Sequence, residues 1–127
     1  MLAWILVRDG KLLNVRTTGK KFFYLPGGKR EPGESDPVGL AREIGEELGV
    51  RIDQRSIRLF DLVTDEADGF ANGRLVRMAC YFAEYEGELT PGREIAELDW
   101  VGLDDALRCA PAGRQVLSRL AERGLLS

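Results

Sequence analysis

The densest group of chemically competent side chains lies in the segment "AREIGEELG", residues 41–49. Its apolar residues recur at helical spacing and a glycine follows them, which predicts the last turns of a helix. Three glutamates share one stripe of that helix, at offsets of three and four residues: Glu43, Glu46 and Glu47. Carboxylates repel one another at these spacings and are unfavourable at the negative end of the helix dipole. Two interpretations stay open: a solvated acidic face, or a site whose oxygen ligands hold Mg²⁺, Mn²⁺ or Ca²⁺.

The absence of histidine narrows the possible chemistry. It excludes Ser–His–Asp and Cys–His catalysis and zinc sites with histidine ligands. The two cysteines, Cys80 and Cys109, lie far apart and form no CxxC pair, so we expect ordinary buried thiols. Catalysis would therefore depend on carboxylates, lysine, arginine, tyrosine or hydroxyl groups, or on a hard metal with oxygen ligands.

The loop before the helix favours the cation site. It reads "LPGGKREPGE", and its glycines permit backbone geometries that turn amides or carbonyls toward a ligand. Lys29 and Arg30 lie within it and could meet phosphate. A glycine-rich loop followed by an acidic helix stripe indicates a site for a metal bound to a phosphorylated substrate.

Residues 28–50, "GKREPGESDPVGLAREIGEELGV", resemble the Nudix box. Its pattern is Gly, five residues, Glu, seven residues, Arg-Glu, an aliphatic residue, any residue, Glu-Glu, any residue, Gly and an aliphatic residue. The nine fixed positions over 23 residues are all filled here, by Gly28, Glu34, Arg42, Glu43, Ile44, Glu46, Glu47, Gly49 and Val50. The strands expected on either side are also similar to a Nudix domain, which extends the resemblance over nearly the whole chain.

The resemblance implies hydrolysis of a pyrophosphate bond in a nucleoside diphosphate linked to another group. It implies that Mg²⁺ or Mn²⁺ is bound by Glu43, Glu46 and Glu47, with the carbonyl of Gly27 as a further ligand. Glu34 would help to hold water or metal, and Arg42 would pair with Glu34 or Glu43 and orient it. The bound cation would neutralise the diphosphate and activate a water, and a carboxylate would remove the proton of that water.

One more glutamate is expected from a later loop, "REIAELDW". Glu94 and Glu97 both precede Trp100, and the place of Glu94 resembles that of the later catalytic glutamate of many family members. We therefore assign Glu94 a catalytic and metal-binding role, with Glu97 as the alternative. A surface glutamate is the other interpretation of each.

Substrate contacts are expected from Arg16, Gly28, Lys29 and Phe70, although exposed basic residues are often only solvated. Phe70 lies in the polar loop "TDEADGFANGR", which could fold over a base. The aromatic residues "FFY" at 22–24 could stack on a base or pack in the core.

The surrounding pattern predicts an α/β fold with a mixed β-sheet sandwiched between α-helices, in one Nudix domain over residues 1–127. The expected strands are 2–7, 12–15, 22–25, 57–63, 75–85 and 98–101. A central helix should begin near residue 37, capped by Ser35 or Asp36, and end at Gly49. Two further helices are expected at 103–108 and 113–123.

The global composition excludes several classes of partner. A net charge of −3 attracts neither nucleic acid nor an anionic membrane. The longest apolar run, "LAWILV", is too short for a bilayer span or a signal peptide, so we expect a cytoplasmic monomer or homodimer.

The start of the first strand bears on the substrate. ADP-ribose pyrophosphatases of the resembling family often carry an extra N-terminal strand region, and here the first strand begins at Leu2. We therefore expect a compact nucleoside triphosphate as the small-molecule substrate. ADP-ribose, nucleotide sugars, dinucleoside polyphosphates and a non-catalytic nucleotide sensor remain the alternatives.

Overall fold

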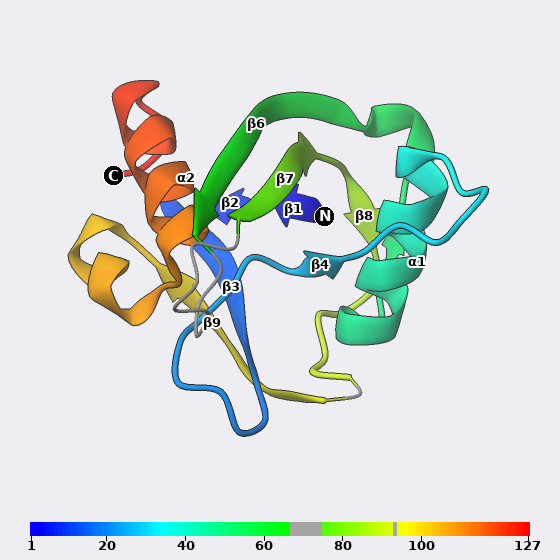
Figure 1. The fold of residues 1–127 in the computed structure, drawn as a ribbon, viewed down its shortest axis with the longest axis horizontal. Coiled ribbons are helices and arrows are strands. Elements are labelled where there is room, and N and C mark those ends of the chain that lie inside the picture. Colours follow the sequence, from blue (N-terminus) through cyan, green and yellow to red (C-terminus); the bar gives the residue numbers. More distant parts are fainter. Residues whose placement is uncertain (67–74, 93) are drawn as a thin grey trace.

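The computed structural model describes residues 1–66, 75–92 and 94–127. Two helices flank the strands, and short 3₁₀ helices (η) lie in two connections (Figure 1). In chain order the elements are β1 (Leu2–Ile5), β2 (Val7–Arg8), β3 (Lys11–Thr17), β4 (Gly27–Gly28), α1 (Asp36–Leu48), β5 (Arg51–Ile52), η1 (Gln54–Ser56), β6 (Arg58–Glu66), β7 (Leu75–Phe82), β8 (Tyr85–Glu86), β9 (Ile95–Val101), η2 (Leu103–Arg108) and α2 (Pro111–Glu122).

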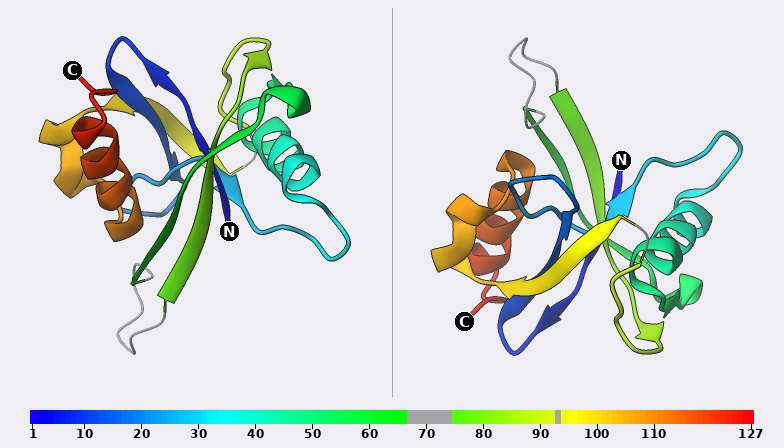
Figure 2. Two further views of the ribbon diagram at one scale, coloured as in Figure 1. Left: turned by 90° about the horizontal axis from the view of Figure 1, so that it is seen from above. Right: turned by 90° about the horizontal axis from the view of Figure 1, so that it is seen from below.

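The main sheet has the order β4-β1-β7-β6 and is mixed, because β1 pairs in parallel with β7 while the other neighbours are antiparallel. A second sheet has the order β2-β3-β9, and β5 pairs with β8. Helices α1 and α2 lie on opposite sides of the strands (Figure 2). The prediction of a mixed sheet between helices is confirmed.

Strand β1 supplies core residues to both helices. Leu2 and Trp4 belong to the apolar cluster that includes Ile44 of α1, whereas Ala3 and Ile5 belong to the cluster that includes Leu117 of α2. Successive side chains of a strand point to opposite faces, so a strand buried on both faces must be apolar throughout. The run "LAWI" therefore becomes the centre of the layered structure.

Helix α1 is fixed at both ends by local chemistry. The Ser35 hydroxyl accepts a hydrogen bond from the Val38 N–H at 3.4 Å, which makes Ser35 the N-cap. Gly49 ends the helix in the left-handed conformation, with φ of 69°. One stripe is fully buried against the sheet, by Leu40, Ile44 and Leu48. The glutamates consequently occupy the part of the helix surface that the core does not use.

The free edge of β6 is covered by side chains from α2 and from the residue that caps its C-terminal end. Residues one helical turn apart donate hydrogen bonds to alternate carbonyl groups of the strand: Gln115 to Thr64 at 2.9 Å, Arg119 to Leu62 at 3.0 Å and Arg123 to Phe60 at 3.3 Å. An uncovered edge would present these acceptors to another strand. The helix thus satisfies the edge of the sheet as well as packing on its face.

One local prediction is wrong. Residues 22–25 form no regular strand, since Phe23 and Tyr24 make only isolated bridges to Cys109 and Val15. The helix expected at 103–108 is present with those bounds and is a 3₁₀ helix. No helix within the described residues is long and apolar enough to cross a membrane.

Candidate active site

A small acidic cleft lies where α1, β4 and the start of β9 meet. Its volume is about 240 Å³, and its walls are Thr17, Gly27, Glu43, Glu46, Glu47, Glu94 and Ile95. The structure thus brings the three helix glutamates together with the glutamate of the later loop. It also adds Thr17 and Ile95, which no sequence pattern indicated.

An ion pair ties the loop before α1 to the helix. The Arg42 guanidinium donates to both carboxylate oxygens of Glu34, from Nε at 2.7 Å and from Nη2 at 2.9 Å. It also donates to Glu43 Oε1 at 3.0 Å and to the Lys29 carbonyl at 3.0 Å. The planar guanidinium suits such paired contacts, so Arg42 fixes the positions of Glu34 and Glu43 together.

Hydrogen bonds shift the pKa of Glu34. The Arg42 side chain is the largest cause and the Glu31 backbone N–H, 2.7 Å from Glu34 Oε1, is the second; they lower the pKa of Glu34 to about 2. The Glu34 carboxylate in turn raises the pKa of Arg42. Both groups therefore stay charged across the neutral range.

The backbone of β4 approaches the helix glutamates closely. The Gly27 N–H donates to Glu47 Oε1 at 2.6 Å. A Cβ atom on Gly28 would lie 2.4 Å from the Glu43 carboxyl carbon, so a side chain there would displace that carboxylate from its present position. Gly28 therefore has a steric role beside Glu43, in addition to the substrate role expected from the sequence.

Glu47 is the most perturbed acid of the cleft. Burial raises its pKa to about 7, and the negative charges of Glu43, Glu46 and Glu94 act in the same direction. The hydrogen bond from Gly27 opposes this shift without cancelling it. The cleft thus concentrates negative charge that the described protein groups do not fully compensate.

The structure separates the two candidate glutamates of the later loop. Strand β9 shifts register against β3 between Arg16 and Thr17, so Arg16 pairs with Glu97 and Thr17 pairs with Ile95. Glu97 accepts from Arg16 Nε at 2.8 Å, whereas Glu94 lines the cleft. An irregularity of this kind re-aims side chains, which is why the spacing to Trp100 alone could not decide between them.

The atoms of the cleft that could coordinate a metal are all oxygens, which are the ligands that hard divalent cations prefer. Within the described residues, no group of three or more acidic or cysteine side chains already stands as a metal cage. Glu47 and Glu43 instead accept N–H groups, from Gly27 and Arg42. The residue types fit Mg²⁺ or Mn²⁺, and a cation would have to compete with these protein donors.

A largely apolar cavity of about 310 Å³ adjoins the cleft and shares Thr17, Gly27 and Glu47 with it. Tyr24, Met78 and the first residues of α2 contribute to its other walls. The full set of its lining residues is Met1, Leu2, Ala3, Val15, Thr17, Lys20, Tyr24, Leu25, Gly27, Gly28, Glu47, Val76, Met78, Ala110, Ala112 and Gly113. Of the aromatic residues at 22–24, Phe23 packs in the core and Tyr24 faces the cavity.

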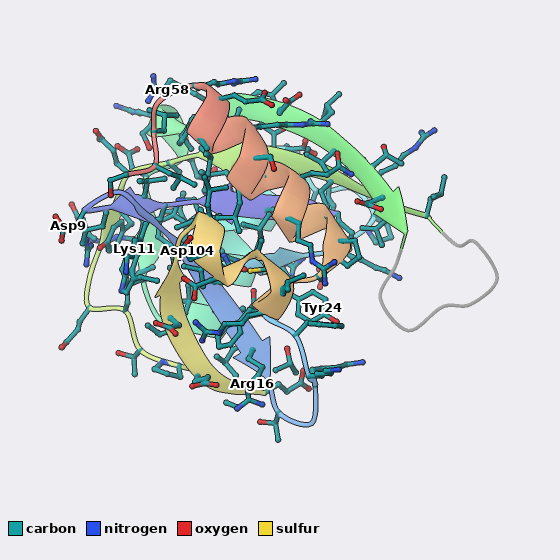
Figure 3. The ribbon with its side chains drawn as sticks, turned by 90° about the vertical axis from the view of Figure 1, so that its left-hand side faces the viewer. Asp9, Lys11, Arg16, Tyr24, Arg58 and Asp104 are labelled. Carbon is teal, nitrogen blue, oxygen red and sulfur yellow. The ribbon has the colours of Figure 1, made fainter. Side chains whose placement is uncertain are left out.

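Other predicted substrate residues lie elsewhere. Figure 3 shows Arg16 and Tyr24 on the side of the molecule that carries α2, but only Tyr24 lines the cavity. Arg16 points to the face opposite Thr17, where it binds Glu97. Lys29 borders a groove of about 670 Å³ with Arg30 and Arg77, and this groove shares Met1, Leu2 and Met78 with the cavity. Phe70 lies outside the described residues.

Comparisons with known proteins agree with this architecture. In a curated "MutT-like protein" of Streptomyces ambofaciens, 53 residues are 42% identical, covering 41% of this chain and 34% of that protein. The part of the chain that matches thus spans about a third of the length of this relative.

Two solved structures are similar over most of their length. For the "MutT NUDIX hydrolase from Burkholderia pseudomallei" the TM-score is 0.78 at 28% identity, covering 94% of this chain and 95% of that one. For an "ADP-ribose pyrophosphatase" from Streptococcus suis the TM-score is 0.68 at 21% identity, covering 94% of this chain and 84% of that one. A model described as "NUDIX domain" matches residues 1–120, so the chain belongs to the Nudix family of hydrolases, which act on pyrophosphate bonds.

Proposed function

We propose that this chain, as a single domain over residues 1–127, hydrolyses a pyrophosphate bond of a nucleoside triphosphate with Mg²⁺ or Mn²⁺. One observation carries the proposal: the acidic cleft opens into an apolar cavity, and the two share Thr17, Gly27 and Glu47. A nucleotide has the same division, a polyanionic chain that needs cations beside a flat base that apolar walls accept.

The acidic residues have separate proposed roles. Glu43, Glu46, Glu47 and Glu94 would hold the cation, with the Gly27 carbonyl as a further ligand. Arg42 would keep Glu43 in place through the 3.0 Å contact between Nη1 and Oε1. Glu34 would fix Arg42 through its two short hydrogen bonds and so act on the helix glutamates indirectly.

A bound divalent cation would neutralise the diphosphate and lower the pKa of a coordinated water. The side chain of Glu94 lines the cleft without belonging to the glutamate stripe of α1, which makes it the proposed general base that accepts the proton of the attacking water. Burial beside three other acids holds the Glu47 pKa near 7 in the metal-free cleft, so cation binding would also displace a proton from Glu47.

Cavity size favours a compact substrate. A volume of about 310 Å³ lies at the low end of the usual range for small-molecule pockets, about 300–1,000 Å³. A cavity of this volume suits a substrate with one nucleoside better than a larger substrate that also carries a second nucleoside or a sugar. The fold does not distinguish between these substrate classes, because MutT and ADP-ribose pyrophosphatase structures are both similar to this one.

A nucleotide panel tests the proposal. The purified protein would be assayed against nucleoside triphosphates, ADP-ribose, nucleotide sugars and dinucleoside polyphosphates at fixed Mg²⁺ and Mn²⁺. We expect the highest kcat/KM for a nucleoside triphosphate. A tenfold advantage for ADP-ribose, about 1.4 kcal/mol in transition-state binding, would reverse the substrate order. Tight nucleotide binding without turnover would instead indicate a sensor.

A further inference from the structure

The loop before β9 docks on the C-terminal end of α1. The Thr90 N–H donates to the Leu48 carbonyl at 2.9 Å, and the Gly92 N–H donates to the Glu47 carbonyl at 2.7 Å. The last carbonyl groups of a helix have no partner within the helix, so these two contacts satisfy groups that would otherwise need water. The loop and the helix that carries the glutamates are therefore joined through backbone atoms.

Only glycine permits this contact at residue 92. A Cβ atom there would lie 2.3 Å from the Glu46 carbonyl oxygen and 3.0 Å from the Glu47 carbonyl oxygen. Backbone oxygens of a helix cannot move aside as a flexible side chain can. A side chain at this position would therefore push the loop away from α1.

The docked loop also helps to fix the backbone conformation of Glu94. Glu94 has a φ of 68°, a conformation that residues with a Cβ rarely adopt. The Thr18 N–H donates to the Glu94 carbonyl at 2.8 Å, and the Ile95 N–H donates to the Gly92 carbonyl at 3.2 Å. A strained residue keeps such a conformation only when its surroundings fix it, and here the fixing groups are Thr18 and the docked loop.

We infer that Gly92 is a positioning residue for Glu94. Its docking on α1 sets where the Glu94 carboxylate stands relative to Glu43, Glu46 and Glu47 across the cleft. This inference rests on the proposed role of Glu94, and it assigns no substrate or metal contact to Gly92. It predicts that a side chain at residue 92 lowers activity by displacing the Glu94 carboxylate.

A double-mutant cycle separates this positioning from a merely structural role. Gly92→Ala would be compared with wild type, and Gly92→Ala combined with Glu94→Gln would be compared with Glu94→Gln alone. We expect Gly92→Ala to lower kcat about 10–100-fold with KM little changed, the scale of a misplaced catalytic group. In the Glu94→Gln background the same substitution should change kcat by less than about twofold.

A matched glycine controls for the added methyl group. Gly102 lies at the other end of β9 and has a φ of −116°. Among the described residues, no atom outside its chain neighbours would lie within 4 Å of an added Cβ. Gly102→Ala should leave kcat unchanged. Equal losses of kcat in both Glu94 backgrounds, or no loss from Gly92→Ala, would overturn the inference.

Two readouts do not need turnover. The cycle would be repeated on Mn²⁺ affinity, where Gly92→Ala should weaken binding only when Glu94 is present. Hydrogen exchange of the wild-type protein would follow the Thr90 and Gly92 amides, which should be protected like those of α1. Free exchange at both amides would overturn the inference even if Gly92→Ala failed to fold. The wild-type protein could also hydrolyse no nucleotide while Gly92→Ala weakens Mn²⁺ binding only when Glu94 is present. That result would count against the proposed function and would still support the positioning role of Gly92.

Discussion

The Glu47 carboxylate accepts the Gly27 N–H at 2.6 Å, and it does so inside a cleft that it shares with three other acids. The hydrogen bond favours the charged form of Glu47, but burial and the neighbouring charges outweigh it and raise the pKa to about 7. In the metal-free protein, Glu47 is therefore a partly buried acid that costs stability when it ionises.

This relationship predicts an unusual pH dependence. The folded-state pKa of Glu47 is raised from 4.5 to about 7, so between these values the folded state binds more protons than the unfolded state. The free energy of unfolding of the metal-free protein should fall as pH rises from about 4.5 to 7, on the order of 1–3 kcal/mol. Urea unfolding in EDTA at several pH values measures it.

Glu47→Gln should remove most of this fall, because glutamine still accepts the Gly27 N–H but carries no charge. The exposed Glu88→Gln substitution is the control and should leave the pH profile as in wild type. An unchanged profile in Glu47→Gln would mean that another group causes the dependence.

Metal removal gives the second prediction. The oxygen ligands of the cleft imply that EDTA abolishes hydrolysis and that Mg²⁺ or Mn²⁺ restores it. Glu46→Gln should strongly reduce the restored activity. In EDTA its stability should equal or slightly exceed that of wild type, because the relief of like-charge repulsion offsets the loss of the half-exposed 3.5 Å ion pair with Arg42. Full activity of the dialysed, chelated protein would contradict a metal-dependent mechanism.

The paired substitutions Glu94→Gln and Glu97→Gln provide a third test. Glu94 lines the cleft, whereas Glu97 binds Arg16 on the opposite face of the sheet. Glu94→Gln should lower kcat and kcat/KM together by roughly 10²–10⁴-fold, the usual scale for general acid–base groups. Glu97→Gln should stay near wild type. The reverse result would assign the catalytic carboxylate to Glu97.

The Arg42–Glu34 pair gives a fourth prediction. The pKa of Glu34 is lowered to about 2, so the pair stabilises the fold above about pH 4.5 and this contribution disappears as pH falls toward 2. Glu34→Gln should therefore lower the urea midpoint at pH 7 more than it does at pH 2.5. The matched control is Glu31→Gln. The Glu31 carboxylate lies 3.8 Å from the Arg42 guanidinium and is more exposed than that of Glu34, so this substitution should have a smaller effect.

The covered edge of β6 gives a fifth prediction. Arg119→Met keeps the apolar stem but loses the hydrogen bond to the Leu62 carbonyl and the 3.0 Å ion pair with Asp61. The free energy of unfolding should fall by about 1 kcal/mol, and the exposed edge should increase aggregation on heating. Thermal unfolding with light scattering measures both effects. Lys11→Met, an exposed charge on β3, should change neither.

Local sequence information determined the helix that carries the three glutamates. The helical spacing of the apolar residues, a cap at Ser35 or Asp36 and the stop at Gly49 predicted α1 and the stripe of its glutamates without reference to distant residues. The structure then chose Ser35 as the cap and buried Leu40, whereas Val38 is exposed. The fixed spacing from Gly28 to Val50 likewise identified the family, and the apolar run at the start of the chain indicated the strand β1. Each of these features depends on neighbours within a few residues.

Features that join distant segments were decided only by the tertiary structure. The register shift between β3 and β9 sends Glu94 and Thr17 into the cleft and sends Arg16 and Glu97 to the other face. Residues 22–25 have the composition of a strand, yet they pair only with Val15 and Cys109, through isolated bridges. Strand register follows from the packing of whole elements, so a shift of one residue moves a side chain across the sheet without leaving any trace in the local pattern.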